Sequence, residues 1–342
     1  MRGLALLALF LLAACARPAD PNVTELTYAT QYSPAHPFSR ADIAWMRYVE
    51  QRSGGKLRIR PIWSGTLLSS DMSMEELRHG VADIGLITPI YVRGGTHLIR
   101  IQSGFYSGVR EIENQVALYR CIAAANPQIA HELEGLQVLA VQGGLLPGII
   151  TRDRPIRSLA DLRGLRIRAP TELLSVLRDL GADPVNMPMG EVYQAMAKRI
   201  IDGVIAPPDT FRALHLAEVA SYYSSLSIPR GAYPARAMGT RRWNSLTPEQ
   251  RRILEESIPV WEAALASENR AALDRGLAEA RTRNVTFTQI APAEQARFEA
   301  LYLRDAEINA RGMTRFGIDG LAAFRTARSS VRPDGGVACG GR

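Results

Sequence analysis

Short apolar segments alternate with amphipathic ones along most of the chain, beginning near residue 26. Residues 26–30 and 57–62 predict strands, and in the second of these apolar and polar positions alternate strictly. Residues 37–52 predict a helix, because apolar side chains recur at helical spacing before a Ser-Gly-Gly stop. A helix over 70–79 and a strand over 82–88 repeat the pattern. This alternation is typical of a largely parallel sheet with helices on its faces.

The same alternation recurs downstream and predicts a second α/β unit that begins near residue 146. Strands bounded by Gly or Pro again follow helices with an apolar stripe. The predicted strands cover residues 137–141, 165–169 and 203–206, and the predicted helices cover 171–180, 190–200 and 292–314.

A long helix is predicted to begin after Thr247, an N-cap residue that is followed by proline and has Gln250 at the capping-box position. The helical pattern continues through Ala280, so the helix is on the order of 50 Å long at 1.5 Å per residue. We expect Pro259 and Gly276 to bend it. Its apolar positions do not keep a heptad, so we expect it to run along both α/β units rather than form a coiled coil.

The first residues are typical of an export signal. Residues 1–14 carry a positive charge and then a short apolar run that ends in small residues before Cys15. The run is too short to span a bilayer and resembles a bacterial lipoprotein signal, in which Cys15 is acylated and becomes the new N-terminus. Residues 15–24 are then a polar tether, and the lipid holds the protein at a membrane outside the cytoplasm. The alternative is an ordinary exported protein cleaved after Ala14.

Composition excludes several classes of protein. The chain has 342 residues, enough for two domains, and its 46% hydrophobic and 22% charged residues are ordinary for a globular protein. No apolar run approaches the roughly 20 residues of a membrane helix, which excludes a polytopic membrane protein. The formal net charge is +7, but the arginines that dominate it are scattered among acidic residues. This distribution favours a mildly basic surface over a nucleic-acid interface.

Residues that commonly catalyse reactions or bind metals form no recognisable set. The chain lacks nucleophile-elbow, zincin, dinucleotide-binding and P-loop motifs, so we expect no cofactor. Its five histidines share no ligand spacing and it has no CxxC pair, so no metal site is predicted. In an oxidising compartment Cys121 and Cys339 either form a disulfide or remain two separate thiols. We expect such a protein to bind a ligand rather than transform it, in the crevice at the carboxyl ends of its strands.

One strand places an arginine where that crevice is expected. Within residues 165–169, Arg166 and Arg168 face one side and the apolar residues face the other. Arg168 lies at the carboxyl end of the strand, so its guanidinium can reach the crevice and bind a carboxylate through two parallel hydrogen bonds. An Arg-x-Arg strand taken alone more often marks a solvated face.

Four stretches resemble the substrate-binding receptors of TRAP transporters, the tripartite ATP-independent periplasmic systems. Their order and spacing cover roughly residues 26–285. They are YVEQRSGGKL at 48–57, GTL with EELRHGVADIG at 65–85, DLRGLRIRAP at 161–170, and LGADPV, EVYQAM and IDGV within 180–204. The resemblance implies a two-lobed α/β receptor, not an enzyme, with a ligand cleft between the lobes and a long helix along both. It also implies that Arg168 binds the carboxylate of the ligand.

The resemblance further implies hinge closure on the ligand and delivery to a membrane permease from the periplasm. We expect one domain over residues 25–145 and 232–272, and the other over 146–231 and 273–328. Residues 329–342 are expected to form a flexible tail.

Two departures from the family pattern bear on the ligand. Ala206 stands where many members have a ligand-binding asparagine, and residues 145–148 carry no cation where some acid-binding members have a second arginine. We therefore expect a cleft of low polarity that takes a monocarboxylate with an apolar or aromatic body. Besides Arg168 and Ala206, the residues predicted to line it are Tyr91, Met187, Met189, Tyr233 and, from the end of the first strand, Gln31 or Tyr32.

Two other classes of protein remain open at this point. A receptor of an ABC transporter has the same two-lobed plan and differs in its membrane partner. An exported lipoprotein hydrolase is the weaker alternative, because the sequence displays no nucleophile or acid–base set. No nucleic-acid partner is expected for any of these classes or for a TRAP receptor.

Overall fold

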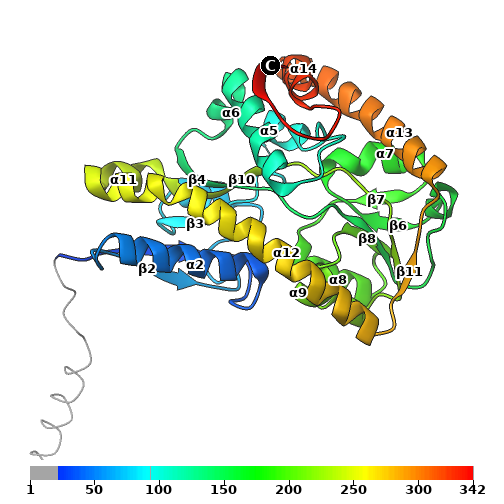
Figure 1. Cartoon of the computed structure of the whole chain (residues 1–342), viewed down its shortest axis with the longest axis horizontal. Coiled ribbons are helices and arrows are strands. Elements are labelled where there is room, and N and C mark those ends of the chain that lie inside the picture. The colour runs from blue at the N-terminus through cyan, green and yellow to red at the C-terminus, as the bar shows by residue number, and fades with distance from the viewer. Residues whose placement is uncertain (1–21, 93, 342) are drawn as a thin grey trace, which may run out of the picture.

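The computed structural model describes residues 22–92 and 94–341. The predicted signal peptide, the acylation site at Cys15 and most of the predicted tether lie outside the described residues. The described chain forms two lobes, each built around one sheet, and a long helix crosses from one lobe to the other (Figure 1). The predicted two-lobed α/β fold is confirmed.

The first lobe contains a five-stranded mixed sheet. Its strands are β1 (Thr24–Ala29), β2 (Leu57–Ile62), β3 (Ile84–Leu86), β4 (Leu136–Gln142) and β10 (Tyr233–Gly239). They lie in the order β2-β1-β3-β10-β4. The predicted parallel pairing joins β1 to β2 and to β3, whereas β10 is antiparallel to β3 and β4. β10 differs because it enters the sheet after the chain has passed through the other lobe.

The second lobe contains a six-stranded mixed sheet. Its strands are β5 (Gly148–Thr151), β6 (Arg166–Arg168), β7 (Asp183–Val185), β8 (Gly203–Ala206), β9 (Tyr222–Ser224) and β11 (Thr286–Thr288). They lie in the order β11-β9-β5-β8-β6-β7. The strands predicted over 165–169 and 203–206 are β6 and β8, which are parallel neighbours. The chain passes from the first lobe to the second between β4 and β5, and this connection is called the crossover. β5, the first strand after it, is antiparallel to β8 and β9.

Helices cover both sheets (Figure 1). Those preceding the crossover or following β10 are α2 (Pro37–Arg52), α3 (Ser73–Arg78), α4 (His97–Gln102), α5 (Ile112–Ala125), α6 (Pro127–Glu132), α10 (Thr240–Ser245) and α11 (Pro248–Glu256). Those between β6 and β9 are α7 (Leu174–Asp179), α8 (Met189–Ala197) and α9 (Thr210–Ala213), with a 3₁₀ turn η3 (Thr171–Leu173) before α7. The last three are α12 (Ile258–Thr282), α13 (Pro292–Arg311) and α14 (Gly320–Ser330).

The predicted long helix is two helices that meet at Ser257. The capping box of Thr247 and Gln250 starts α11 as expected. The helix ends earlier than predicted because Pro259, in the first turn of α12, has no amide hydrogen to continue the α11 ladder. The hydroxyl of Ser257 accepts a hydrogen bond from Trp45 Nε1 at 2.8 Å, which ties this junction to α2. α12 then runs past the first lobe to the second (Figure 1).

Gly276 allows α12 to lie directly against the backbone of the second lobe. A Cβ at this position would be 2.2 Å from the carbonyl oxygen of Pro208 and 2.6 Å from Cα of Asp209. We expect Gly276→Ala to lower the free energy of unfolding by about 1–3 kcal/mol, because α12 must shift away from this backbone. Urea denaturation measures the change. Gly312→Ala is the matched control, since a Cβ there would meet no atom within 4 Å, and it is expected to be neutral or slightly stabilising.

The C-terminal helices return to the first lobe. Ala310 at the end of α13 and Phe324 in α14 share an apolar core with Phe105 and Tyr106 of the first lobe. The rings of Phe105 and Phe324 are 5.3 Å apart between centroids. The predicted assignment of residues 273–328 to the second domain is therefore wrong for α14 and the end of α13, because their apolar faces pack on the first lobe.

The tail after α14 is folded back rather than free. Cys121 in α5 and Cys339 form a disulfide with their Cα atoms 5.1 Å apart, which decides between the two interpretations left open by the sequence. Val331 pairs with Val337 as an antiparallel bridge, and the amide of Ala338 donates to the carbonyl of Ser330 at 2.9 Å. The prediction of a flexible tail over 329–342 is wrong for the described part, because the disulfide and these hydrogen bonds fix it.

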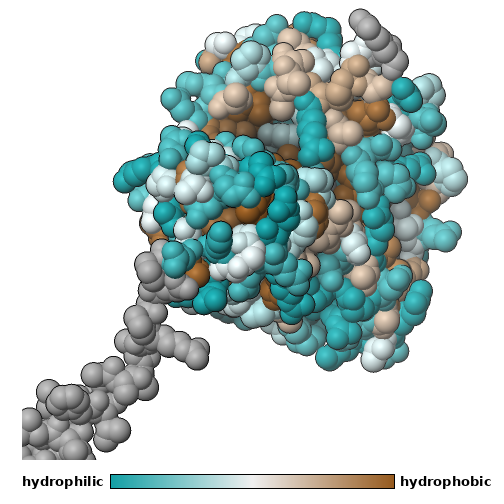
Figure 2. Space-filling view, turned by 60° about the vertical axis from the view of Figure 1, so that its left-hand side comes forward, coloured by the Kyte–Doolittle hydropathy of each residue, from teal (hydrophilic) through white to brown (hydrophobic). Residues whose placement is uncertain are grey.

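Hydrophilic side chains dominate the face in Figure 2, and hydrophobic atoms on it lie in separate small areas and in recesses. Over the described residues, no helix combines the length and apolar character needed to cross a membrane. The large hydrophobic side chains that are exposed on the described surface are Met72, Val81, Ile200, Phe287, Ile308 and Phe316.

Candidate functional site

The ends of strands from both sheets meet at one cleft between the lobes. The loops that follow the carboxyl ends of β1, β3, β6 and β8 all contribute to its lining. β5 and β10 run in the opposite direction, so the residues at their amino ends reach the same place. This is the position at which open α/β sheets commonly bind ligands.

Arg168 occupies the carboxyl end of β6, and its side chain faces this cleft. The residue is 3% exposed. Its Nε donates to the carbonyl of Met187 at 2.9 Å, and its Nη2 donates to the hydroxyl of Tyr91 at 2.8 Å. Tyr91 belongs to the first lobe, so the second hydrogen bond joins the lobes. Arg166, two residues earlier, is exposed and pairs with Asp183 at 3.0 Å.

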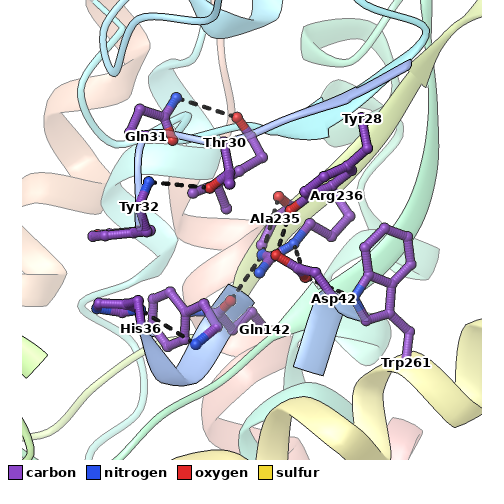
Figure 3. Close-up of polar contacts among 12 residues, drawn as sticks. Tyr28, Thr30, Gln31, Tyr32, His36, Asp42, Gln142, Ala235, Arg236 and Trp261 are labelled. Atoms are coloured by element: carbon purple, nitrogen blue, oxygen red, sulfur yellow. Dashed lines mark hydrogen bonds and ion pairs between the residues drawn. The ribbon is translucent and has the colours of Figure 1, made fainter. Parts of the chain in front are cut away.

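All three predicted tyrosines, Tyr32, Tyr91 and Tyr233, line the cleft. Tyr32 stacks on His36 with 3.9 Å between ring centroids, and Nδ1 of His36 accepts the backbone amide of Phe38 at 3.2 Å, which caps α2 (Figure 3). Burial lowers the pKa of His36 to about 3, so the ring is neutral at physiological pH. Burial raises the pKa of Tyr32 and Tyr233, so their hydroxyls stay protonated and can donate hydrogen bonds to an anion.

Arg230 is a second cleft cation that the sequence analysis missed. It lies in the segment that leads into β10, and its Nη1 donates to the carbonyl of Leu145 at 3.3 Å. Gly144 makes room for it, because a Cβ there would be 2.4 Å from Cζ of Arg230. Residues 145–148 themselves carry no cation, as the sequence shows, but Arg230 reaches this backbone from another part of the chain and makes the cleft more polar than expected.

Two carboxyl groups also line the cleft, Glu172 in η3 and Asp209 at the start of α9. Burial raises the pKa of Glu172 to about 7, against the opposing influence of its own backbone amide and then of Arg168, Arg230 and Arg100. Burial likewise raises the pKa of Asp209 to about 6, against Arg230. The cleft is consequently more polar than the sequence analysis predicts. Within the described residues, no group of His, Cys, Asp and Glu side chains is arranged to hold a metal ion.

The other predicted site residues are divided between the cleft and its surroundings. Met189 lines the cleft, and Met187 lines an adjoining recess. Ala206 is buried behind the lining residues Ile205 and Pro207. Gln31 is turned away and donates to the carbonyls of Ser69 at 2.7 Å and Leu86 at 3.4 Å, so the structure does not bring it to the cleft. The apolar part of the lining is Phe38, Ile90, Pro147, Pro170, Leu173, Met189, Ile205, Pro207, Leu214 and Pro229.

A buried ion pair lies behind the first-lobe wall of the cleft. Arg236 in β10 and Asp42 in α2 are both fully buried, with Nε of the arginine 2.9 Å from Oδ1 of the aspartate (Figure 3). Asp42 also accepts hydrogen bonds from the hydroxyl of Tyr28 at 2.5 Å and from Trp261 Nε1 at 2.9 Å. Burial tends to lower the pKa of Arg236, but the Asp42 carboxylate outweighs this effect and raises it.

Gln142 connects this ion pair to the cleft. Its Oε1 accepts from Nη1 of Arg236 at 2.9 Å, and its Nε2 donates to the hydroxyl of Tyr233 at 3.4 Å. The buried charge pair therefore supports the position of one of the tyrosines that line the cleft.

Removal of the Tyr91 hydroxyl is expected to weaken the contact between the lobes. Tyr91→Phe deletes the hydrogen bond to Arg168, and hydrogen bonds to charged groups contribute about 1.5–3 kcal/mol. Water can accept the freed hydrogen bond of Arg168 and so recover part of this loss. We therefore expect ligand affinity to fall about tenfold in titration calorimetry. Tyr193→Phe is the control, because it removes a hydroxyl that pairs with Glu218 at the surface. Unchanged affinity in Tyr91→Phe would show that this hydrogen bond does not support the ligand-bound form.

Comparison with known proteins matches most of the chain to one family model. The model, described as bacterial extracellular solute-binding protein, family 7, matches residues 28–305. A curated relative, the 2,3-diketo-L-gulonate-binding periplasmic protein YiaO of Escherichia coli (strain K12), is 22% identical over 258 residues. The match covers 70% of this chain and 74% of the relative.

Solved structures share the fold. A TRAP solute-binding protein from Rhodoferax ferrireducens T118, in complex with copurified benzoate, has a TM-score of 0.83 at 23% identity, with 90% of this chain and 97% of that chain covered. A TRAP solute-binding protein from an unidentified marine microbe, specific for aromatic acid ligands and co-crystallised with 3-hydroxybenzoate, has a TM-score of 0.81 at 20% identity, with the same coverage of 90% and 97%. At these identities the likeness establishes the fold alone.

Proposed function

The chain belongs to family 7 of the bacterial extracellular solute-binding proteins, the receptors of TRAP transporters, and from this membership we propose that it captures an organic monocarboxylate between its lobes. TRAP receptors bind small organic acids and work with membrane permease subunits, so the protein is a transport receptor and not an enzyme. The ABC-transporter and hydrolase alternatives are thereby set aside.

The observation that carries the proposal is the buried guanidinium of Arg168. Its two hydrogen bonds go to a carbonyl and a hydroxyl, and no described carboxylate forms an ion pair with it. A buried cation is stable only when an anion or several hydrogen bonds compensate the loss of water. A ligand carboxylate in the cleft supplies that compensation.

The walls of the cleft support a ligand with an apolar or aromatic body. Tyrosines line the first-lobe side, and residues such as Leu173, Met189 and Ile205 line the second-lobe side. Benzoate and 3-hydroxybenzoate occupy the two structural relatives, which is consistent with this preference. The relative named for 2,3-diketo-L-gulonate indicates the competing class, a polar sugar acid.

Hinge closure is the proposed mechanism of capture. Arg168 reaches the ligand from the second lobe, and Tyr32 and Tyr91 reach it from the first, so a bound acid stabilises the closed form by contacts that the open form lacks. The crossover after β4 is anchored by Gln115, whose amide accepts from the Gly144 nitrogen at 2.8 Å and donates to the Gly144 carbonyl at 3.0 Å. We therefore place the bending residues after Gly144.

A thermal-shift screen of organic acids tests the ligand class on protein without its leader. Benzoate, 3-hydroxybenzoate, hexanoate, succinate and glucuronate sample aromatic, aliphatic, dicarboxylic and sugar acids, and a bound acid raises the melting temperature by mass action. Titration calorimetry then ranks the affinities. We expect an aromatic or aliphatic monocarboxylate to bind tightest, and a much tighter dicarboxylate would overturn the proposal.

Attachment of a lipid at Cys15 is part of the same proposal. Members of the family act outside the cytoplasm, and acylation would hold this receptor at a membrane surface. Mass spectrometry of the mature protein detects acyl chains on Cys15. Cys15→Ser is expected to release the protein into the soluble periplasmic fraction, and a wild-type protein found there without lipid would contradict the proposal.

A further inference from the structure

Two carboxyl groups of the chain lie in the cleft that also holds Arg168 and Arg230. Oε2 of Glu172 and Oδ1 of Asp209 are each buried, and neither accepts a hydrogen bond from a described residue. A carboxylate beside the binding site of an anion opposes binding, because like charges repel strongly at short range. The binding of an acid therefore does not by itself account for these two groups.

Charged groups face Glu172 from several elements. Arg168 comes from β6, Arg230 from the segment before β10 and Arg100 from α4, and each favours the ionised form of the carboxyl. Tyr302 of α13 is also close enough for the Glu172 charge to contribute, after burial, to the raised pKa of the tyrosine. None of the three arginines forms an ion pair with Glu172, so their attraction does not cancel the cost of burial. The result is a carboxyl group that changes charge near neutral pH.

We propose that Glu172, whose buried Oε2 has no hydrogen-bond donor among the described residues, is a proton-coupled counter-charge of the ligand: its carboxylate takes up one proton when a ligand carboxylate binds Arg168 in the same cleft. The inference rests on the proposed function, since it requires an anionic ligand in the cleft. The proton comes from solvent and forms the O–H bond of the Glu172 carboxyl, and no bond in the ligand changes. One negative charge enters and one is neutralised, so the net charge of the cleft is the same before and after binding.

The same arrangement limits the number of carboxylates that a ligand can bring. Protonation of Glu172 offsets one incoming negative charge. A second carboxylate would depend on protonation of Asp209, whose pKa of about 6 makes proton uptake less favourable at neutral pH. Glu172 is thus expected to make the affinity for monoanions higher than the affinity for dianions. A lower pH is expected to reduce this difference in affinity.

Calorimetric titration at two pH values tests the inference, with benzoate, hexanoate and glucuronate as probes. All three remain ionised between pH 6 and pH 8, and His36 stays neutral throughout. With a free-receptor pKa of about 7 for Glu172, we expect affinity to fall about tenfold from pH 6 to pH 8. Repeating the titration at pH 7 in buffers of different ionisation enthalpy is expected to show uptake of about half a proton per ligand.

Three variants locate the proton. Glu172→Gln is expected to bind more tightly than the wild type at pH 8 and to show a smaller decrease in affinity from pH 6 to pH 8, with the remaining decrease due to Asp209. Asp209→Asn is expected to keep most of the tenfold decrease, and the exposed control Glu134→Gln all of it. Affinity that is independent of pH in the wild type, or a decrease in Glu172→Gln as large as in the wild type, would overturn the inference alone. Failure of every probe to bind at either pH would overturn the proposed function as well.

Discussion

Replacement of Arg168 by alanine is expected to weaken binding of the transported acid by about 2–4 kcal/mol, which corresponds to about 30- to 1,000-fold in Kd. The loss is large because the ligand carboxylate would remain buried in the closed cleft without its cationic partner. Titration calorimetry against the tightest acid of the screen measures the change. Equal affinity of wild type and Arg168→Ala would remove this residue from the binding site.

Two further variants separate charge, geometry and general effects of the substitution. Arg168→Lys keeps the charge but cannot donate to Met187 and Tyr91 while also forming two parallel hydrogen bonds with a carboxylate, so we expect it to restore only part of the affinity. Arg166→Ala removes an exposed arginine from the same strand and is expected to leave the affinity unchanged. A loss in Arg166→Ala as large as in Arg168→Ala would show that β6 itself is disturbed.

Sequence reasoning could place Arg168 because its position follows from regular structure. A strand alternates its side chains and the carboxyl ends of parallel strands meet at one edge, so the last arginine of β6 had to face the crevice. Arg230 could not be found in this way. It lies in an irregular segment, and its position depends on a glycine, Gly144, that is distant in sequence and close in space. Residues 145–148 therefore carry no local signal for the cation that lies against them.

In the fold, too, elements set by local sequence pattern could be predicted, whereas contacts between distant parts of the chain could not. Local periodicity predicted α2, α8 and β8, and the capping box predicted the start of α11. β10 was not predicted, because its seven residues are all buried and include Arg236, so they show no alternation. The packing of α14 on α5 and the pairing of Cys121 with Cys339 are contacts between distant parts of the chain. No local pattern encodes such contacts.

Loss of the buried aspartate that pairs with Arg236 is expected to be the most destabilising single change considered. Asp42→Leu leaves the guanidinium of Arg236 in the core without its counter-ion, and breaking a buried pair in this way costs about 3–5 kcal/mol. It also removes the acceptor of Tyr28 and Trp261. Urea denaturation measures the loss. Replacement of the exposed pair Arg60 and Glu25 by alanines is the matched control and is expected to cost less than about 1 kcal/mol.

A double-mutant cycle shows whether the destabilisation comes from an unpaired charge or from lost packing. Arg236→Met alone leaves the Asp42 carboxylate buried, whereas Asp42→Leu combined with Arg236→Met removes both charges and keeps apolar volume in their place. We expect the double variant to be at least as stable as either single variant, because its core contains no uncompensated charge. Additive losses would indicate that packing dominates. The double variant is still expected to bind ligand more weakly, since Gln142 loses the donor that holds it against Tyr233 in the cleft wall.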